Sequence, residues 1–314
     1  MRKLLIAVLC FTVIGILGAQ EGSGVTSSRT LDLQISSLPE LKVIFYQTFK
    51  SPCFQGDNFL VRGNNLKVSI GGELTPISGN FLFKAVLTPI AFLELSTGGR
   101  VGSGWPLNLF GSDLYGIGLN QDDGTGKKSY SGTFMDGCLY KGFFGATVQM
   151  DFGLLMSPSD WNHILFQSYH EINYAGYGRA IGDESWHYES DFGENVNGLN
   201  YYGNFVLGYQ LPLMLNLIAF QAEMDLHLYD MPDRSNYGDD LIRWHFAAIL
   251  GFKFTDWLDV KVVTQFRTLK NTLEEPDVLW NKKQTYYRNR NLDTADPLGL
   301  HFYRVAGLIT FKLP

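Results

Sequence analysis

One pair of side chains in this sequence has the types and the spacing that acid–base chemistry needs. Asp225 and His227 stand two residues apart in a segment that alternates apolar and polar residues. Residues two apart in an extended chain point to the same side, so the carboxylate could orient the imidazole as a general base. Asp122 and Asp123 form a second acidic pair in a glycine-rich segment. Asp122 and Asp123 are adjacent, and adjacent residues of a strand point to opposite sides. A pair such as Asp225 and His227 also arises readily by chance, so these four residues establish no catalysis.

The other motifs that carry chemistry are missing from the sequence. The six histidines form no cluster with cysteine at the spacing of zinc ligands, so we expect no metal site. Neither the phosphate-binding loop motif nor the elbow motif of serine hydrolases occurs. We therefore expect no cofactor.

The element that would hold Asp225 and His227 is a strand. Between residues 217 and 229 apolar residues occupy the even positions, and the odd positions from 221 to 227 are polar or charged. Segments 242–254 and 258–267 repeat this alternation, which is typical of amphipathic strands. Seven further segments alternate with lower contrast: 41–49, 66–74, 81–95, 140–154, 163–174, 199–211 and 300–313. The pattern predicts about ten strands.

The predicted connections alternate between short and long. Short turns fall at 75–79, 157–161, 211–215 and 255–257, and long connections span 50–65, 96–139, 175–198, 230–240 and 271–299. In lipid every backbone group must pair internally, which strands achieve only in a closed barrel. We therefore predict an all-β transmembrane antiparallel β-barrel of about ten strands, with short periplasmic turns and long outer loops. Extra strands within the loops, for example at 283–290, would give twelve.

The N-terminus predicts export. Residues 1–19 combine a basic start, an apolar stretch and a small-residue end, as a secretory signal peptide does. We assign residues 20–40 to a lead segment and 41–314 to a single barrel domain in the outer membrane. No apolar run reaches the length of a helical membrane span. The net charge of -6 argues against a nucleic-acid partner, which would require a basic face.

Two cysteines remain after the signal peptide is removed. In an exported, oxidising setting Cys53 and Cys138 could form one disulfide, or both could stay unpaired. The sequence leaves these alternatives open.

Two segments resemble those of bacterial outer-membrane β-barrel proteins: the hairpin at 249–260 and the last strand at 303–311. The resemblance implies contact with outer-membrane lipid and, during biogenesis, with the barrel-insertion machinery. Such proteins commonly end in an aromatic residue, whereas Phe311 here is followed by three more residues. That ending is similar to those of spirochaetal outer-membrane proteins, among them a possible uncharacterised family.

A weaker resemblance is to the omptins, which are ten-stranded outer-membrane proteases. It implies that Asp225 and His227 act together at the rim of the barrel, facing Asp122 or Asp123 across a cleft. The sequence departs from the omptin pattern because Asp122 and Asp123 are adjacent rather than separated by a spacer.

The polar face of the predicted strands would line the barrel interior. Its ionisable residues include Glu223, Asp225, His227, Arg243, His245, Lys253, Asp259, Lys261, Arg267 and Arg304. Barrels of about eight strands are filled by side chains, and those of about 16 to 18 hold an aqueous channel. Ten strands would enclose a narrow lumen in which most of these charges pair.

Two functions remain open at this point. The barrel is either a narrow conduit for small polar solutes or a scaffold whose loops bind a surface ligand. The alternatives are an omptin-like protease and a secreted soluble β-sandwich or lipocalin-like binding protein. The sequence identifies neither the solute nor the ligand.

Overall fold

A computed structural model describes residues 24–38, 40–109, 111–122, 127–182, 184–189, 195–228, 241–271, 284–285 and 292–314. The expected signal peptide, residues 1–19, lies outside the described residues. No helix in the described part of the chain is long and apolar enough to cross a membrane.

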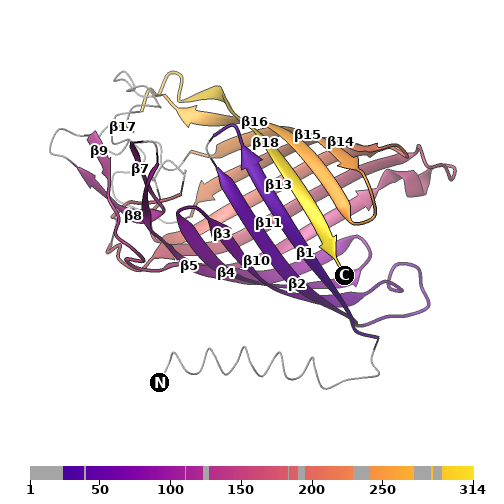
Figure 1. Cartoon of the computed structure of the whole chain (residues 1–314). Coiled ribbons are helices and arrows are strands. Elements are labelled where there is room, and N and C mark those ends of the chain that lie inside the picture. Colours follow the sequence, from indigo (N-terminus) through magenta and orange to yellow (C-terminus); the bar gives the residue numbers. More distant parts are fainter. Residues whose placement is uncertain are drawn as a thin grey trace.

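Twelve antiparallel strands form one closed β-barrel (Figure 1). In chain order they are β1 (Thr26–Ser36), β2 (Leu41–Pro52), β3 (Asn65–Thr75), β4 (Ser78–Ile90), β5 (Leu93–Gly104), β10 (Leu139–Asp151), β11 (His163–Tyr177), β13 (Gly198–Gln210), β14 (Leu215–His227), β15 (Arg243–Lys253), β16 (Leu258–Lys270) and β18 (Leu298–Leu313). The barrel closes where β1 pairs with β18, from Arg29 opposite Leu313 to Ser36 opposite Ala306. The predicted fold class is confirmed, with twelve strands rather than ten.

The two additional strands have different origins. Strand β1 lies inside the predicted lead segment 20–40, where the first five strand residues are polar and the alternation begins only at Leu31. The predicted strand 81–95 is in fact the end of β4, a turn at 91–92 and the start of β5. Apolar residues continue through this turn, so it carries no polar turn signal. The boundary at residue 41 is therefore wrong, and the barrel begins at Thr26.

The two ends of the barrel differ in their connections. One end of the barrel, which we call the turn end, holds the start of β1 and the end of β18. Its connections are 53–64, 91–92, 152–162, 211–214 and 254–257. Connections 37–40, 76–77, 105–138, 178–197, 228–242 and 271–297 lie at the other, the loop end. The four longest connections, 105–138, 178–197, 228–242 and 271–297, lie together at the loop end, as predicted. Segments 50–65 and 75–79 lie at the ends opposite to those predicted, because the turn at 91–92 divides the predicted strand 81–95 in two and so reverses the direction of every strand before it.

This arrangement separates the two cysteines. Cys53 follows β2 at the turn end, Cys138 precedes β10 at the loop end, and both are free. A disulfide requires Cα atoms within about 7 Å, whereas these cysteines are separated by the length of the barrel. The disulfide alternative is therefore wrong.

The separation can be tested by labelling. We expect a membrane-impermeant maleimide to modify Cys138 but not Cys53 on intact cells, because Cys138 is exposed and the longer loops of such barrels face outward. Mass spectrometry of the labelled peptides measures this, and a Cys138→Ser variant is the control. Modification of Cys53 on intact cells would contradict the assigned orientation.

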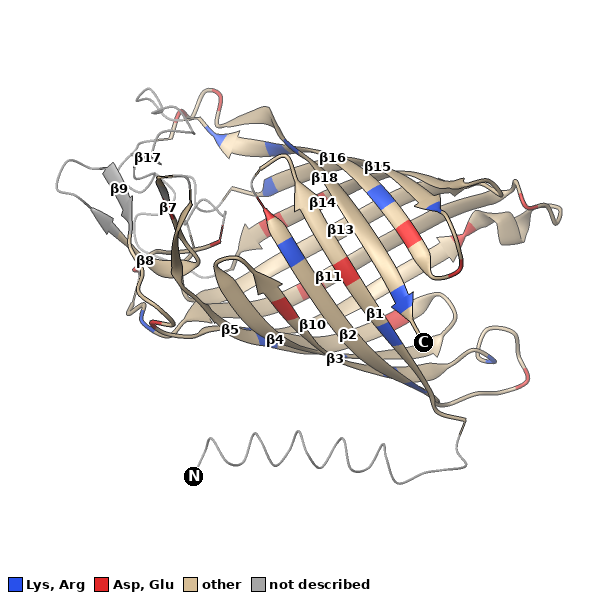
Figure 2. Ribbon diagram, in the orientation of Figure 1, with Lys and Arg blue, Asp and Glu red and all other residues tan. Residues whose placement is uncertain are grey.

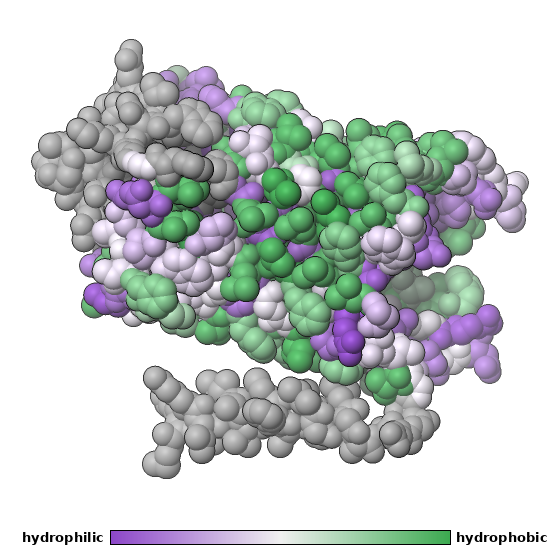
Figure 3. Space-filling view, viewed as in Figure 1, coloured by the Kyte–Doolittle hydropathy of each residue, from purple (hydrophilic) through white to green (hydrophobic). Residues whose placement is uncertain are grey.

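An apolar band surrounds the barrel. Every strand exposes at least one large hydrophobic side chain on its outer face: Ile35, Phe45, Leu74, Phe81, Val101, Phe144, Ile172, Leu207, Phe220, Leu250, Phe266 and Phe302. Figure 3 shows the band on one face, with hydrophilic residues toward both ends. Exposed Trp161 and Trp257 lie beside connections of the turn end, as interface aromatics do. A soluble sandwich or lipocalin-like barrel would not expose such a band to water, so that alternative is excluded.

Two small sheets lie outside the barrel. One has the order β12 (Trp186–Tyr188), β8 (Ile117–Asp122), β9 (Lys127–Tyr130) and β17 (Gln284–Thr285), and the other joins β6 (Pro106–Leu109) to β7 (Ser112–Tyr115). Strand β17 falls within the predicted segment 283–290, but it pairs with β9 and adds nothing to the barrel wall. A short 3-10 helix, η1 (Phe152–Leu155), lies at the turn end.

Candidate functional site

The side chains that alternate with the apolar band face the lumen. Twelve of them are basic: Lys42, Lys50, Lys67, Lys84, Arg100, Lys141, Arg243, Lys253, Lys261, Arg267, Arg304 and Lys312. Eight are acidic: Asp32, Glu73, Glu94, Asp151, Glu171, Glu223, Asp225 and Asp259. Figure 2 shows charges of both signs along the strands. All ten ionisable residues predicted to line the interior lie on this face.

Ion pairs in the lumen follow the wall. Lys141 pairs with Glu171 at 2.8 Å on the neighbouring strand, and Lys312 pairs with Asp259 at 2.7 Å. Lys67 reaches Glu94, two strands away, at 2.9 Å. The pairs of Lys42 and Arg100 with Glu73, and of His163 with Asp151, likewise join neighbouring or next-but-one strands. Pairs of this kind run along the wall rather than across the lumen.

The lumen is wider than that of the predicted ten-stranded barrel. Twelve strands spaced about 4.8 Å apart and tilted by about 40° enclose a backbone cylinder roughly 24 Å across. Lys84 lies at the centre of β4 on the inner face, and its side chain is exposed. Lys261 on β16 is also exposed on the inner face. Neither lysine has an ion pair within the described residues.

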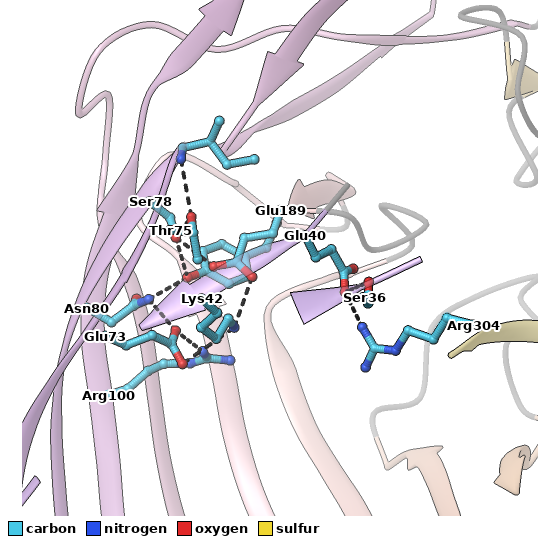
Figure 4. A network of polar contacts seen from close by, with 12 residues as sticks. Ser36, Glu40, Lys42, Glu73, Thr75, Ser78, Asn80, Arg100, Glu189 and Arg304 are labelled. Atoms are coloured by element: carbon cyan, nitrogen blue, oxygen red, sulfur yellow. Dashed lines mark hydrogen bonds and ion pairs between the residues drawn. The ribbon is translucent and has the colours of Figure 1, made fainter. Parts of the chain in front are cut away.

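The loop between β11 and β13 crosses the mouth at the loop end. It contains β12, and its residue Tyr188 contacts the inner faces of β4 and β5. Glu189 contacts the inner faces of β2 and β4 (Figure 4). Strand β2 lies five positions from β11 in the twelve-strand order, so the loop spans nearly half the circumference. The segment therefore narrows the entrance.

Glu189 anchors this loop to the barrel wall. Its carboxylate pairs with Lys42 at 3.1 Å and accepts a hydrogen bond of 2.6 Å from the Ser78 hydroxyl. Lys42 also pairs with Glu73 at 3.4 Å, and Arg100 pairs with Glu73 at 3.2 Å. The wall thus contributes two cations and one acid, and Glu189 from the loop balances the charge of this network.

Tyr188 supplies the second anchor. Its hydroxyl accepts a hydrogen bond of 2.5 Å from the Asn80 amide, and the Arg100 guanidinium lies 5.2 Å from the ring centroid. Burial, followed by the nearby Glu189 carboxylate, raises the pKa of Tyr188. The phenol is therefore neutral across the physiological range and remains a hydrogen-bonding anchor.

The anchor predicts a dependence of docking on pH. Burial alone would raise the pKa of Glu189, but the Lys42 ammonium and the hydrogen bonds from Ser78 and Tyr188 hold it below the usual value of a glutamate. A lowered pKa means that ionised Glu189 stabilises the docked loop above the usual glutamate pKa, and that this stabilisation is lost as the pH falls through the lowered value. We expect the protection of this loop from limited proteolysis to fall over that acidic range, and a Glu189→Gln variant to lack the change. Protection of the wild-type loop that does not depend on pH would contradict this assignment.

A small apolar core supports the same loop. Ile117, Leu139, Tyr177, Trp186 and Tyr188 are buried together at the loop end. Strand β12 pairs with β8 with Tyr188 opposite Ile117, so the core and the polar anchors share one strand. The loop is therefore packed rather than extended.

Close backbone contacts also hold the loop assembly together. A Cβ atom at Gly118 would lie 1.6 Å from the Ser131 carbonyl oxygen, so only glycine fits. We expect Gly118→Ala to shift the backbone and destabilise this packing by about 1–3 kcal/mol. Gly63, which has nothing within 4 Å of its Cβ position, is the matched control. Limited proteolysis of the loops in each folded alanine variant measures the difference, and equal protection would contradict it.

The predicted acid–base pair does not form a free catalytic dyad. Asp225 and His227 both face the lumen near the loop end of β14. The Nδ1 atom of His227 lies 2.5 Å from the Asn200 amide oxygen, and its Nε2 accepts from the Arg243 guanidinium at 3.0 Å. Both ring nitrogens thus have partners other than Asp225, which removes the free base that the omptin resemblance requires.

The predicted facing acids lie elsewhere in the chain. Asp122 ends β8 opposite Lys128, in a small sheet outside the barrel wall. Asp123 lies outside the described residues. Among the described residues, the predicted protease site is therefore not assembled.

A β-bulge in β18 shapes the opposite wall of the lumen. The register shift beside Gln265 leaves Tyr303 as the extra residue between Phe302 and Arg304. Its ring centroid lies 3.9 Å from the Arg267 guanidinium carbon and 4.8 Å from that of Arg304. Arg304 also donates to Gln265 at 2.5 Å and pairs with Glu40. The bulge thus holds two of the predicted lumen arginines against an aromatic ring.

The residues that narrow the mouth were absent from the predicted site. Tyr188, Glu189 and Arg100 fall in predicted connections, and Lys42 falls in a predicted strand whose alternation is weak. The sequence shows that such residues exist, but not that a loop folds back onto them.

The fold and lumen define the class of this protein: it is a transmembrane β-barrel with a polar, charged interior. The apolar band, the closed sheet and the lumen-facing charges together carry this assignment. No protein-family model matches the chain, and no curated protein matches it in sequence.

Solved structures similar to this chain are bacterial outer-membrane proteins. The NanC porin is 8% identical with a TM-score of 0.40, covering 92% of this chain and 100% of that chain. The KdgM porin has the same identity and coverage with a TM-score of 0.35. OmpT, an outer membrane protein of Vibrio cholerae, is 8% identical with a TM-score of 0.35, covering 94% of this chain and 99% of that chain. Likenesses at this level carry no argument about the solute.

Proposed function

We propose that this protein is an outer-membrane conduit through which small polar solutes, preferentially anions, cross the bilayer. The exposure of Lys84 carries the proposal. This residue lies at mid-strand on the inner wall, and a long side chain is exposed there only when the space beside it can hold water. The ion pairs support the same conclusion, because they join residues along the wall rather than across the lumen.

The preference for anions follows from the charge of the lumen. Twelve lumen-facing bases oppose eight lumen-facing acids, and Glu40 and Glu189 add two acids at the mouth. The excess is concentrated below the mouth, at Lys84 and Lys261, where no described acid pairs with either lysine. A low-dielectric wall focuses such a field and raises the local concentration of anions.

Conductance of the refolded mature protein in a planar bilayer tests the proposal. Heat-modifiable gel mobility first confirms a folded barrel. We expect discrete current steps and, in a potassium chloride gradient, a reversal potential displaced toward that of chloride. A folded but silent protein would contradict the conduit, whereas a reversal potential displaced toward potassium would contradict the anion preference alone.

The display of interaction loops has less support. The described parts of connections 105–138 and 178–197 form a small sheet and a shared core at the mouth. Loops that pack in this way are suited to shaping an entrance.

A further inference from the structure

Three polar side chains interrupt the apolar band on the outer face of β11 and β13. The Ser168 hydroxyl lies 2.9 Å from Nε2 of His170, and Nδ1 of His170 lies 2.5 Å from the Tyr201 hydroxyl. His170 is exposed. With the proton on Nδ1, Ser168 donates to the ring and the ring donates to Tyr201.

The cluster faces the lipid rather than the lumen. Phe166 and Ile172, which share the face of Ser168 and His170 on β11, are 36% and 55% exposed. Leu199 and Leu207, on the face of Tyr201, are 47% and 56% exposed. Placing an imidazole on a lipid-facing surface costs free energy, so a residue of this kind by default indicates a functional site.

The cluster is also accessible from the bilayer. In the sheet register His170 lies opposite Ala146 on β10 and Gly203 on β13. The side chains of Met224 and Phe205 occupy the space over Gly203, so the imidazole is open on the side of Ala146. The Phe205 ring packs edge-on against the imidazole with centroids 5.5 Å apart and fixes its orientation. An acyl chain lying on the barrel could therefore place a carbonyl group beside Ser168.

We propose that Ser168, His170 and Tyr201 form a site that hydrolyses acyl esters within the membrane. The hydrogen bonds match those of a serine nucleophile and its base: Ser168 lies beside Nε2 of His170, and Tyr201 orients the imidazole through Nδ1. Ser168 Oγ attacks the ester carbonyl carbon as its proton passes to Nε2 of His170. The C–O bond of the ester breaks, and the leaving alcohol takes that proton. Water then attacks the acyl-serine in the same way, releasing the fatty acid and restoring Ser168.

The position of the cluster defines the substrate class. His170 is the middle residue of the fifteen-residue strand β11, so the site lies deep in the apolar band. A charged headgroup would have to leave water for its ester to reach this depth, which favours neutral acyl esters. Amide groups of the flanking strands are engaged in the sheet ladders, so oxyanion stabilisation is weak and we expect slow turnover. The site uses the outer face and does not depend on the conduit.

Covalent labelling of the full-length folded barrel tests the proposal. We expect a fluorophosphonate probe in detergent micelles to modify Ser168, as located by mass spectrometry. Labelling and hydrolysis of trioctanoylglycerol should fall by about 100-fold or more in Ser168→Ala and His170→Ala. Ser69→Ala, which changes a lumen-facing strand serine, should retain both activities.

Two further measurements separate catalysis from structure. Tyr201→Phe should lower kcat about tenfold with KM unchanged, because the phenol positions the imidazole without contacting substrate. Trioctanoylglycerol should be cleaved at least about tenfold faster than dioctanoyl phosphatidylglycerol, because only the latter brings a charged headgroup. A folded wild-type barrel that neither reacts with the probe nor cleaves the neutral ester would overturn the proposal. Equal cleavage of the two lipids would overturn the substrate class.

Discussion

A barrel carrying Tyr188→Ala and Glu189→Ala should conduct roughly twice the current of the wild type per channel, because pore width sets conductance. The substitutions remove the Lys42 ion pair and the hydrogen bonds from Ser78 and Asn80, which together hold the loop across the mouth. Losing hydrogen bonds to a buried carboxylate costs about 1.5–3 kcal/mol each, which is sufficient to release a short segment. Single-channel recording of the refolded variant measures the change.

A matched control lies in the same loop. Glu184 is exposed, and its carboxylate accepts a hydrogen bond of 2.9 Å from the Ile181 amide without touching the barrel wall. Glu184→Gln should therefore leave the conductance unchanged. Equal conductance in the wild type and the Tyr188/Glu189 variant would show that another segment limits the current. In that case the narrow point would lie below the mouth.

Reversing Lys84 and Lys261 together should abolish the anion preference. Lys84→Glu and Lys261→Glu replace two of the twelve lumen-facing bases by acids, which leaves ten of each sign on the strands. Both lysines are exposed and have no ion pair in the described structure, so reversal breaks no ion pair there. We expect the chloride-to-potassium permeability ratio to fall from about 3 to about 1, since fixed charge in a narrow pore sets the local ion concentration.

A control on the outer surface isolates the effect of the lumen. Arg29 lies on the outer face of β1 near the turn end, where it donates to Gln47 at 2.9 Å. Arg29→Glu changes the net charge as much as Lys84→Glu does, yet it should leave the reversal potential unchanged. A shift of similar size in both single variants would mean that overall charge, rather than the lumen wall, governs selectivity. Neither reversal should alter the heat-modifiable mobility of the folded barrel.

These two predictions assign different tasks to different levels of the barrel. The Tyr188 and Glu189 anchors act at the mouth, where width is set by a loop folded against the wall. Lys84 and Lys261 act deeper in the lumen, where the wall charge is uncompensated. The mouth variant should therefore change conductance with little effect on selectivity, and the lysine variants should do the reverse.

The sequence by itself determined the class of fold and the sidedness of the strands. Alternation from residue 218 to 228 assigns Glu223 and Asp225 to the inner face and Phe220 to the outer face, because side chains on a strand alternate with a period of two. This rule is local, so it holds strand by strand without knowledge of the partner strands. It fails where the alternation is weak, as at the start of β1, or where a turn is apolar, as at 91–92.

Only the tertiary structure decided how the lumen is arranged. Lys42 and Glu189 are separated by 147 positions in the sequence, and nothing in either segment indicates that they meet. The same is true of the Ser168 and His170 pair with Tyr201, which depends on the register between β11 and β13. Contacts of this kind follow from strand order, register and loop packing, which are global properties of the closed sheet. Period-two alternation specifies which face of the sheet a residue occupies. It does not specify which residues of other strands or loops lie beside it, and the site is made of such contacts.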